Sequence, residues 1–100
     1  MVFADLTYPQ RYEEKHEELC SLLKSRFSHV ESGLQCDSWI LVRFGEDKVA
    51  VDTFTSMTHQ VKSSRAGKHV QEVIAVLKEQ FTVSVRKEPE WEAHEDQSSS

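Results

Sequence analysis

Residues 38–54 read SWILVRFGEDKVAVDTF, which is two β-branched and aromatic runs joined by a polar spacer. The runs cover residues 38–44 and 49–54, and the spacer Gly45 to Lys48 is rich in turn-forming residues. This pattern predicts an antiparallel β-hairpin. We therefore expect an antiparallel sheet to form the framework of the fold.

The alternation of side chains along this hairpin predicts two different faces. With the turn centred on residues 46 and 47, the expected pairs are Phe44 with Val49, Val42 with Val51 and Ile40 with Thr53 on one face, and Arg43 with Ala50, Leu41 with Asp52 and Trp39 with Phe54 on the other. The first face is almost wholly apolar and should be the core. The second face should be open to solvent, where a polar surface is normal. Its residues Trp39, Leu41 and Phe54 therefore predict a contact site for a second copy of the chain, a partner protein or the chain's own tail.

Two helices are predicted from apolar residues that recur at steps of three and four. The first covers about residues 8–31, with Thr7 as its cap and Gly33 as its stop, and the second begins after Ser63 or Ser64. Their apolar faces are Tyr12, His16, Leu19, Leu23, Phe27 and Val30 in the first, and Val70, Val73, Ile74, Leu77 and Phe81 in the second.

The fold class follows from the order of these elements. Residues 82–86 alternate as a strand that Pro89 should soon end, and residues 2–6 are a further candidate strand. If residues 2–6 pair, the order is β-α-β-β-α-β, as in ferredoxin-like folds; otherwise it is α-β-β-α-β. Either order predicts an α+β two-layer sandwich, with two helices on one face of a small antiparallel sheet.

The net charge of −5 comes from the end of the chain. Residues 88–100 hold five acids and no Lys or Arg, while residues 1–87 hold 12 of each sign. We expect a single domain over 1–87 and an acidic, disordered tail over 88–100, where Trp91 is either folded back or a short binding motif. A nearly neutral domain disfavours nucleic acid as the main partner, and no apolar run is long enough to cross a membrane.

The two cysteines, Cys20 and Cys36, have neither a metal-binding nor a disulfide-framework spacing. They predict a reduced protein of the cytoplasm or nucleus. His16 and Cys20 lie one helical turn apart but have no third ligand nearby, so we expect Cys20 to be a small buried hydrophobe and predict no metal and no cofactor. The sequence contains no catalytic motif either.

A basic island offers a second candidate site at the start of the second helix. Residues 53–71 contain no acid, and the cationic candidates there are His59, Lys62, Arg65, Lys68 and His69. A helix N-terminus favours anions, so Lys62, Arg65, Lys68 and His69 predict a weak phosphate or anion site. The spacing does not match a nucleotide-binding loop.

Three functions remain open at this point. The first is a non-catalytic protein-interaction or adaptor domain that uses the open sheet face. The second is a nucleic-acid or phosphate-binding module that uses the basic island, although residues 48–54 do not carry stacking aromatics at the positions expected of an RNA-recognition strand. The third is a small enzyme whose site is assembled from scattered residues.

Overall fold

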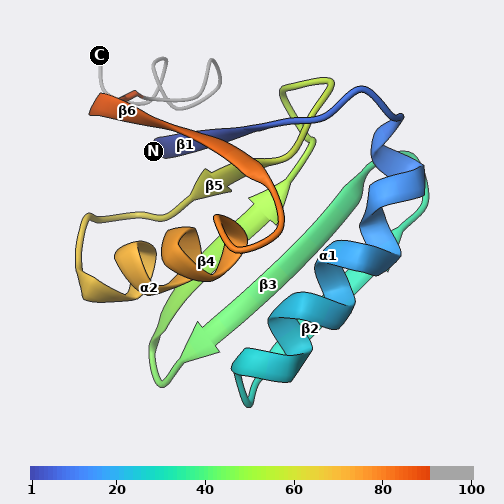
Figure 1. Cartoon of the computed structure of the whole chain (residues 1–100). Coiled ribbons are helices and arrows are strands. Elements are labelled where there is room, and N and C mark those ends of the chain that lie inside the picture. Colours follow the sequence, from blue (N-terminus) through green and yellow to red (C-terminus); the bar gives the residue numbers. More distant parts are fainter. Residues whose placement is uncertain (91–100) are drawn as a thin grey trace.

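The computed structural model describes residues 1–90, and residues 91–100 lie outside the described range. Two helices cover one face of a six-stranded antiparallel sheet (Figure 1). The elements are β1 Val2–Thr7, α1 Tyr12–Arg26, β2 Val30–Leu34, β3 Ser38–Phe44, β4 Asp47–Asp52, β5 Gln60–Lys62, α2 Lys68–Leu77 and β6 Thr82–Glu90. This arrangement confirms the predicted α+β two-layer class.

The strands lie in the order β2-β3-β4-β5-β1-β6. The N-terminal segment is therefore a strand, and it lies inside the sheet between β5 and β6. Two strands, β2 and β5, were not predicted, so the expected β-α-β-β-α-β order gains a strand on either side of the central hairpin. Both are short, and neither shows the alternation that marks a half-buried strand.

The first helix is shorter than its periodicity predicted. It begins at Tyr12 rather than at residue 8. At this start, the Arg11 amide donates a hydrogen bond to the Glu14 carboxylate at 3.1 Å. It ends at Arg26 because Phe27 is extended, with φ −126° and ψ 144°. Phe27 and Val30 fit the helical spacing of apolar residues although they lie beyond the helix. Both pack against the core from non-helical backbone.

The hairpin register is shifted by two residues from the predicted one. Phe44 pairs with Asp47, so the loop is only Gly45 and Glu46, and Gly45 has a φ of +65°. A positive φ at the first loop residue and a negative φ at the second match the tight hairpin turn that favours glycine first. Because a shift of two preserves the side-chain alternation, the two faces keep their predicted residues.

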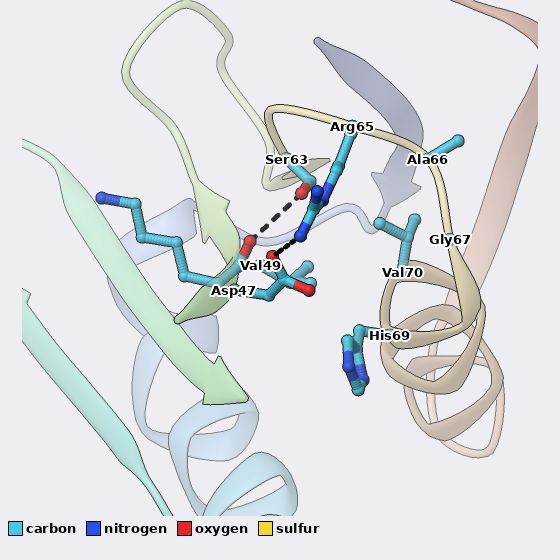
Figure 2. A pocket seen from close by; sticks show the side chains of 9 residues that line it. Asp47, Val49, Ser63, Arg65, Ala66, Gly67, His69 and Val70 are labelled. Carbon is cyan, nitrogen blue, oxygen red and sulfur yellow. Dashed lines mark hydrogen bonds and ion pairs between the residues drawn. The ribbon is translucent and has the colours of Figure 1, made fainter. Parts of the chain in front are cut away.

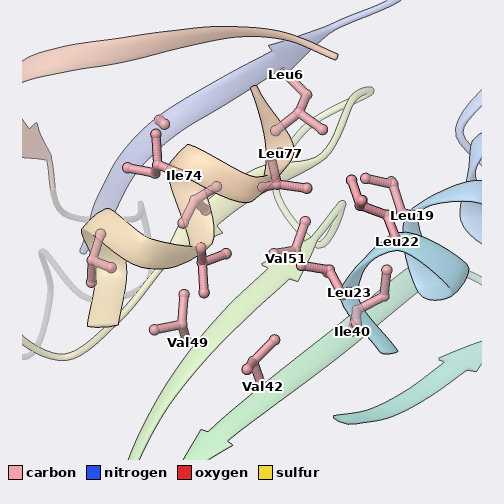
Figure 3. Packing of buried hydrophobic residues seen from close by; sticks show 14 of the residues in the cluster. Leu6, Leu19, Leu22, Leu23, Ile40, Val42, Val49, Val51, Ile74 and Leu77 are labelled. Atoms are coloured by element: carbon pink, nitrogen blue, oxygen red, sulfur yellow. The ribbon is translucent and has the colours of Figure 1, made fainter. Parts of the chain in front are cut away.

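The core lies between the helices and the apolar face of the sheet (Figure 3). Leu19 and Leu23 of α1 point toward Ile40 of β3, while α2 packs over β4 (Figure 3). The second helix begins at Lys68, with Gly67 as its N-cap residue. This start is later than the predicted one, which had Ser63 or Ser64 as the cap. Of its predicted apolar face, Val70, Val73, Ile74 and Leu77 are buried, whereas Phe81 lies beyond the helix end at Leu77 and is partly buried.

The last described strand continues past Pro89, and Glu90 pairs with Val2. Proline is tolerated there because β6 is an edge strand. Residues 88–90, the start of the predicted acidic tail, are thus the end of β6, and the rest of that tail, with Trp91, lies outside the described residues. None of the helices within residues 1–90 has the length and apolar character needed to cross a membrane.

Candidate functional site

Most of the exposed large hydrophobic residues lie near one end of the sheet, with Leu34 on the helix-covered face and Trp39 on the open face. Among residues 1–90, the large hydrophobic residues that are exposed are Leu34, Trp39, Phe54, Met57 and Val85. The first four lie where β2 ends, β3 begins and β4 runs into the loop of residues 53–59. We call Leu34, Trp39, Phe54 and Met57 the apolar end.

Trp39 and Phe54, two of the three predicted contact residues, come together at this end. They line one shallow depression of about 220 Å³ with Gln35, Cys36 and Asp37. The Trp39 ring lies on Gly33 of the neighbouring strand, where an added Cβ would be only 2.5 Å from the indole nitrogen. Gly33 therefore provides the space that lets the ring lie flat on the sheet. Trp39 stays 36% exposed and Phe54 55% exposed, so both can contact a partner.

Leu41, the third predicted contact residue, is partly exposed and lies in an adjacent groove of about 170 Å³. It pairs with Ala50, and Asp52 and Lys62 form part of the same groove. The Lys62 ammonium donates to the Asp52 carboxylate at 2.6 Å, and the two side chains are 6% and 5% exposed. An ion pair therefore interrupts the apolar character of the open face beside Leu41.

A buried chain of polar side chains lies under the apolar end. Tyr8 Oη is 2.7 Å from His59 Nδ1, and His59 Nε2 is 2.7 Å from Ser38 Oγ. Ser38 Oγ is in turn 2.6 Å from His16 Nδ1, and His16 Nε2 is 3.4 Å from Cys20 Sγ. The four contacts join the β1–α1 connection, α1, the start of β3 and the loop before β5.

The environment of the polar chain favours a neutral ring at His59. Its two ring nitrogens contact the hydroxyls of Tyr8 and Ser38, and burial disfavours a charged imidazole there. Burial, followed by the neighbouring His16, lowers the pKa of His59 to about 4. Burial also raises the pKa of the Tyr8 phenol, which keeps its proton available to the chain.

The position of the polar chain assigns it a structural role. Ser38 and His59 have no exposed surface, so a substrate has no access to the serine between the two imidazoles. The Ser38 amide also donates to Thr53 Oγ1 at 3.1 Å, and the Thr53 amide donates to the Ser38 carbonyl at 3.1 Å. The loop that carries Phe54 and Met57 is thus fixed at both of its ends, at Thr53 and at His59.

The basic island is spread over several environments rather than gathered at one site. Lys62 is paired with Asp52, and the Arg65 guanidinium pairs with Asp47 beside a cavity of about 30 Å³ (Figure 2). His69 stacks on Phe44, with ring centroids 4.1 Å apart.

The two remaining residues of the island lie apart from each other. Lys68 is exposed at the start of α2, whereas His59 belongs to the buried polar chain. Of the four predicted anion ligands, only Arg65 and His69 line the cavity, and they share it with the carboxylate of Asp47.

His16 and Cys20 are both buried, and their side chains contact each other. Within the described residues, no group of three or more His, Cys, Asp or Glu side chains is arranged to hold a metal ion. Cys36, by contrast, is exposed and free at the apolar end.

Two features of this site were not predicted from the sequence. Leu34 and Met57 were missed because the strand β2 and the loop 53–59 carry no periodic pattern. The polar chain was missed because three of its four contacts join residues that are 21, 22 and 51 positions apart, and no spacing rule connects them. Searches of family models, curated proteins and solved structures found no match to this chain.

Proposed function

We propose that this chain is a non-catalytic protein-interaction domain whose apolar end binds a segment of a partner protein. One observation carries the proposal: Trp39 and Phe54, two of the five exposed large hydrophobic residues within residues 1–90, line the same depression. Scattered surface hydrophobics are normal, but a gathered group with a polar surround is typical of contact sites.

The support beneath the apolar end strengthens this proposal. The buried polar chain and the Thr53 contacts hold the loop 53–59 in place. A preorganised surface binds more tightly because less conformational entropy is lost on association. Interface hot spots are also enriched in tryptophan, which fits the exposed ring of Trp39.

The lining of the depression defines the partner segment that fits it. Its volume of about 220 Å³ suits one large apolar or aromatic side chain between Trp39 and Phe54. Asp37 also lines the depression, and its carboxylate forms no ion pair with another residue within the described range. We infer that the partner segment carries an apolar side chain next to a Lys or Arg.

A phosphate- or nucleic-acid-binding role has weaker support. Lys62 and Arg65 already neutralise carboxylates of the same domain, and Asp47 lies within the cavity that Arg65 lines. Bringing a phosphate there would place it against that carboxylate, which is unfavourable.

A peptide-display selection against the full chain tests the proposed function. We expect enriched peptides with an apolar residue beside a basic one, and we expect Trp39→Ser to weaken their binding at least tenfold. The matched control is Val85→Ser, which removes an exposed hydrophobic side chain on β6, away from the apolar end, and should leave binding unchanged. Equal binding by both variants, or selection of acidic peptides only, would contradict the proposal. A nuclease-treated affinity purification separates a protein partner from a nucleic acid.

A further inference from the structure

The two edges of the sheet differ in how they are protected against pairing with another strand. The edge strand β6 carries Arg86, Lys87 and Pro89, and charges and proline on an edge discourage a further strand. The opposite edge strand β2 reads VESGL, has no proline and carries a single charged residue, Glu31. From this difference, we propose that β2 pairs in an antiparallel manner with β2 of a second copy, which joins the two sheets into one.

The backbone groups of β2 that point outward follow from its pairing with β3. The Arg43 amide donates to the His29 carbonyl at 2.9 Å, so these two residues form a hydrogen-bonded pair. Hydrogen-bonded and non-hydrogen-bonded pairs alternate along an antiparallel ladder. Glu31 and Gly33 therefore turn their backbone groups toward β3. The residues that turn theirs toward the open edge are Val30, Ser32 and Leu34.

A twofold axis at Ser32 satisfies all of these outward groups. Ser32 then faces Ser32 of the copy, and Val30 faces Leu34 of the copy, so every outward residue meets an outward residue. Leu34, which is 40% exposed in the single chain, gains an apolar partner.

The charges on β2 select this register over its neighbours. With the axis at Ser32, the Glu31 side chain lies opposite Gly33 of the copy, where there is no side chain to oppose it. With the axis one residue earlier, Glu31 would face Glu31 of the copy, and like charges directly opposite destabilise a sheet. With the axis one residue later, Val30 would face Cys36 of the copy, which lies outside β2, so the ladder between the two β2 strands would be shorter.

The helix above this edge leaves room for a second copy. α1 packs on both β2 and β3. A helix axis between those strands lies about one strand spacing from the seam, which places α1 and its copy ~10 Å apart, a normal distance for packed helices.

The charges of α1 also fit its copy. Tyr12 donates to the Cys36 carbonyl at one end of β2, and Phe27 precedes His29 at the other, so Ser32 lies level with the middle of α1. Glu17 and Lys24 are both exposed and lie seven residues apart on one side of the helix. In the antiparallel arrangement, Glu17 lies near Lys24 of the copy.

Such a dimer would place the Trp39 side chains of both copies on one composite surface. A twofold axis perpendicular to the sheet leaves both open faces on the same side, and the two Trp39 Cα atoms would be about 16 Å apart, given the spacing of strands and residues. This consequence rests on the proposed function, whereas the dimer itself does not.

Analytical ultracentrifugation of the full chain tests the dimer, with proline variants at the two edges. We expect the wild type to sediment at twice its chain mass of 11.6 kDa and Ser32→Pro to sediment as a folded monomer. The Ser32 amide points to solvent in the single chain, so its loss should leave the circular dichroism unchanged. The matched control is Val85→Pro. Leu6 donates its amide to the carbonyl of His59, the residue before β5, so Leu6 turns its backbone groups away from β6. The alternation along the β1–β6 ladder then turns the Val85 amide outward, and this variant should stay dimeric.

Disulfide trapping tests the register. In a Cys36→Ser background, Ser32→Cys should form a disulfide-linked dimer under mild oxidation, and Glu31→Cys should not. A monomeric wild type at high micromolar concentration would overturn the dimer, and a dimer that survives Ser32→Pro would overturn its β2 edge. Equal trapping by Glu31→Cys would overturn the register. Peptide binding by the monomeric Ser32→Pro variant would show that the proposed function holds independently.

Discussion

At the scale of single residues, His59 stands out because the fold opposes its protonation. It has no exposed surface, and its pKa falls from 6.5 to about 4 because of burial and then the nearby His16. The other side chains in contact with its ring are Tyr8 and Ser38, and neither is a carboxylate that would stabilise the imidazolium. The native structure therefore needs the neutral ring.

The stability of the protein should consequently fall in mild acid. The unfolded chain binds a proton at His59 below pH 6.5, whereas the folded chain binds it only near pH 4. The contribution of the neutral His59 ring to the free energy of unfolding is therefore fully present above pH 6.5 and is lost as the pH falls to about 4. The free energy of unfolding should lose about 3 kcal/mol across this window from His59 alone. Urea unfolding at a series of pH values measures the loss. His59→Gln should be less stable at neutral pH but should lack this part of the pH dependence; an unchanged slope would contradict the assignment.

At the scale of elements, β4 and β5 are joined by a buried ion pair as well as by their backbone ladder. Asp52 pairs in register with Gln60, and its carboxylate accepts from Lys62 two residues further along β5. Such a pair contributes little net stability compared with apolar residues, but either partner left alone is costly because a buried charge loses its compensation.

Replacing Lys62 with Met should therefore destabilise the protein by about 3 to 5 kcal/mol, because Asp52 would remain buried without its cation. The double variant Asp52→Val with Lys62→Met should recover most of this loss. Denaturant unfolding of the wild type, the single variant and the double variant measures both effects. If the single variant unfolds at the wild-type midpoint, the pair is more hydrated than its 5% and 6% exposure indicates.

At the scale of the whole molecule, the polar chain ties separate parts of the fold to the apolar end. Ser38 is its central member, since its hydroxyl contacts both His16 and His59. Removing the hydroxyl leaves two buried imidazole nitrogens without a partner, and each such group carries a desolvation cost.

Ser38→Ala should lower the free energy of unfolding by about 1 to 3 kcal/mol. It should also speed hydrogen exchange in residues 53–59 more than in α2, because the loop loses one of its anchors. Ser84→Ala is the control, since Ser84 is an exposed serine on β6. Uniformly faster exchange across the chain would indicate a general loss of stability without a specific role in holding the loop.

The sequence by itself determined the layers, the central hairpin and the buried face of α2, because each depends on local alternation or helical spacing. It placed Trp39 on the open face even with the register off by two, since side-chain direction depends only on odd or even position. Tertiary structure alone decided the rest. The strands β2 and β5 form because β3, β4 and β1 offer unpaired edges, not because VESGL or QVK favour strands by themselves. The ends of α1, the Tyr8 to Cys20 polar chain and the pairing of Lys62 and Arg65 with carboxylates likewise depend on residues distant in sequence, whose proximity only the packed chain creates.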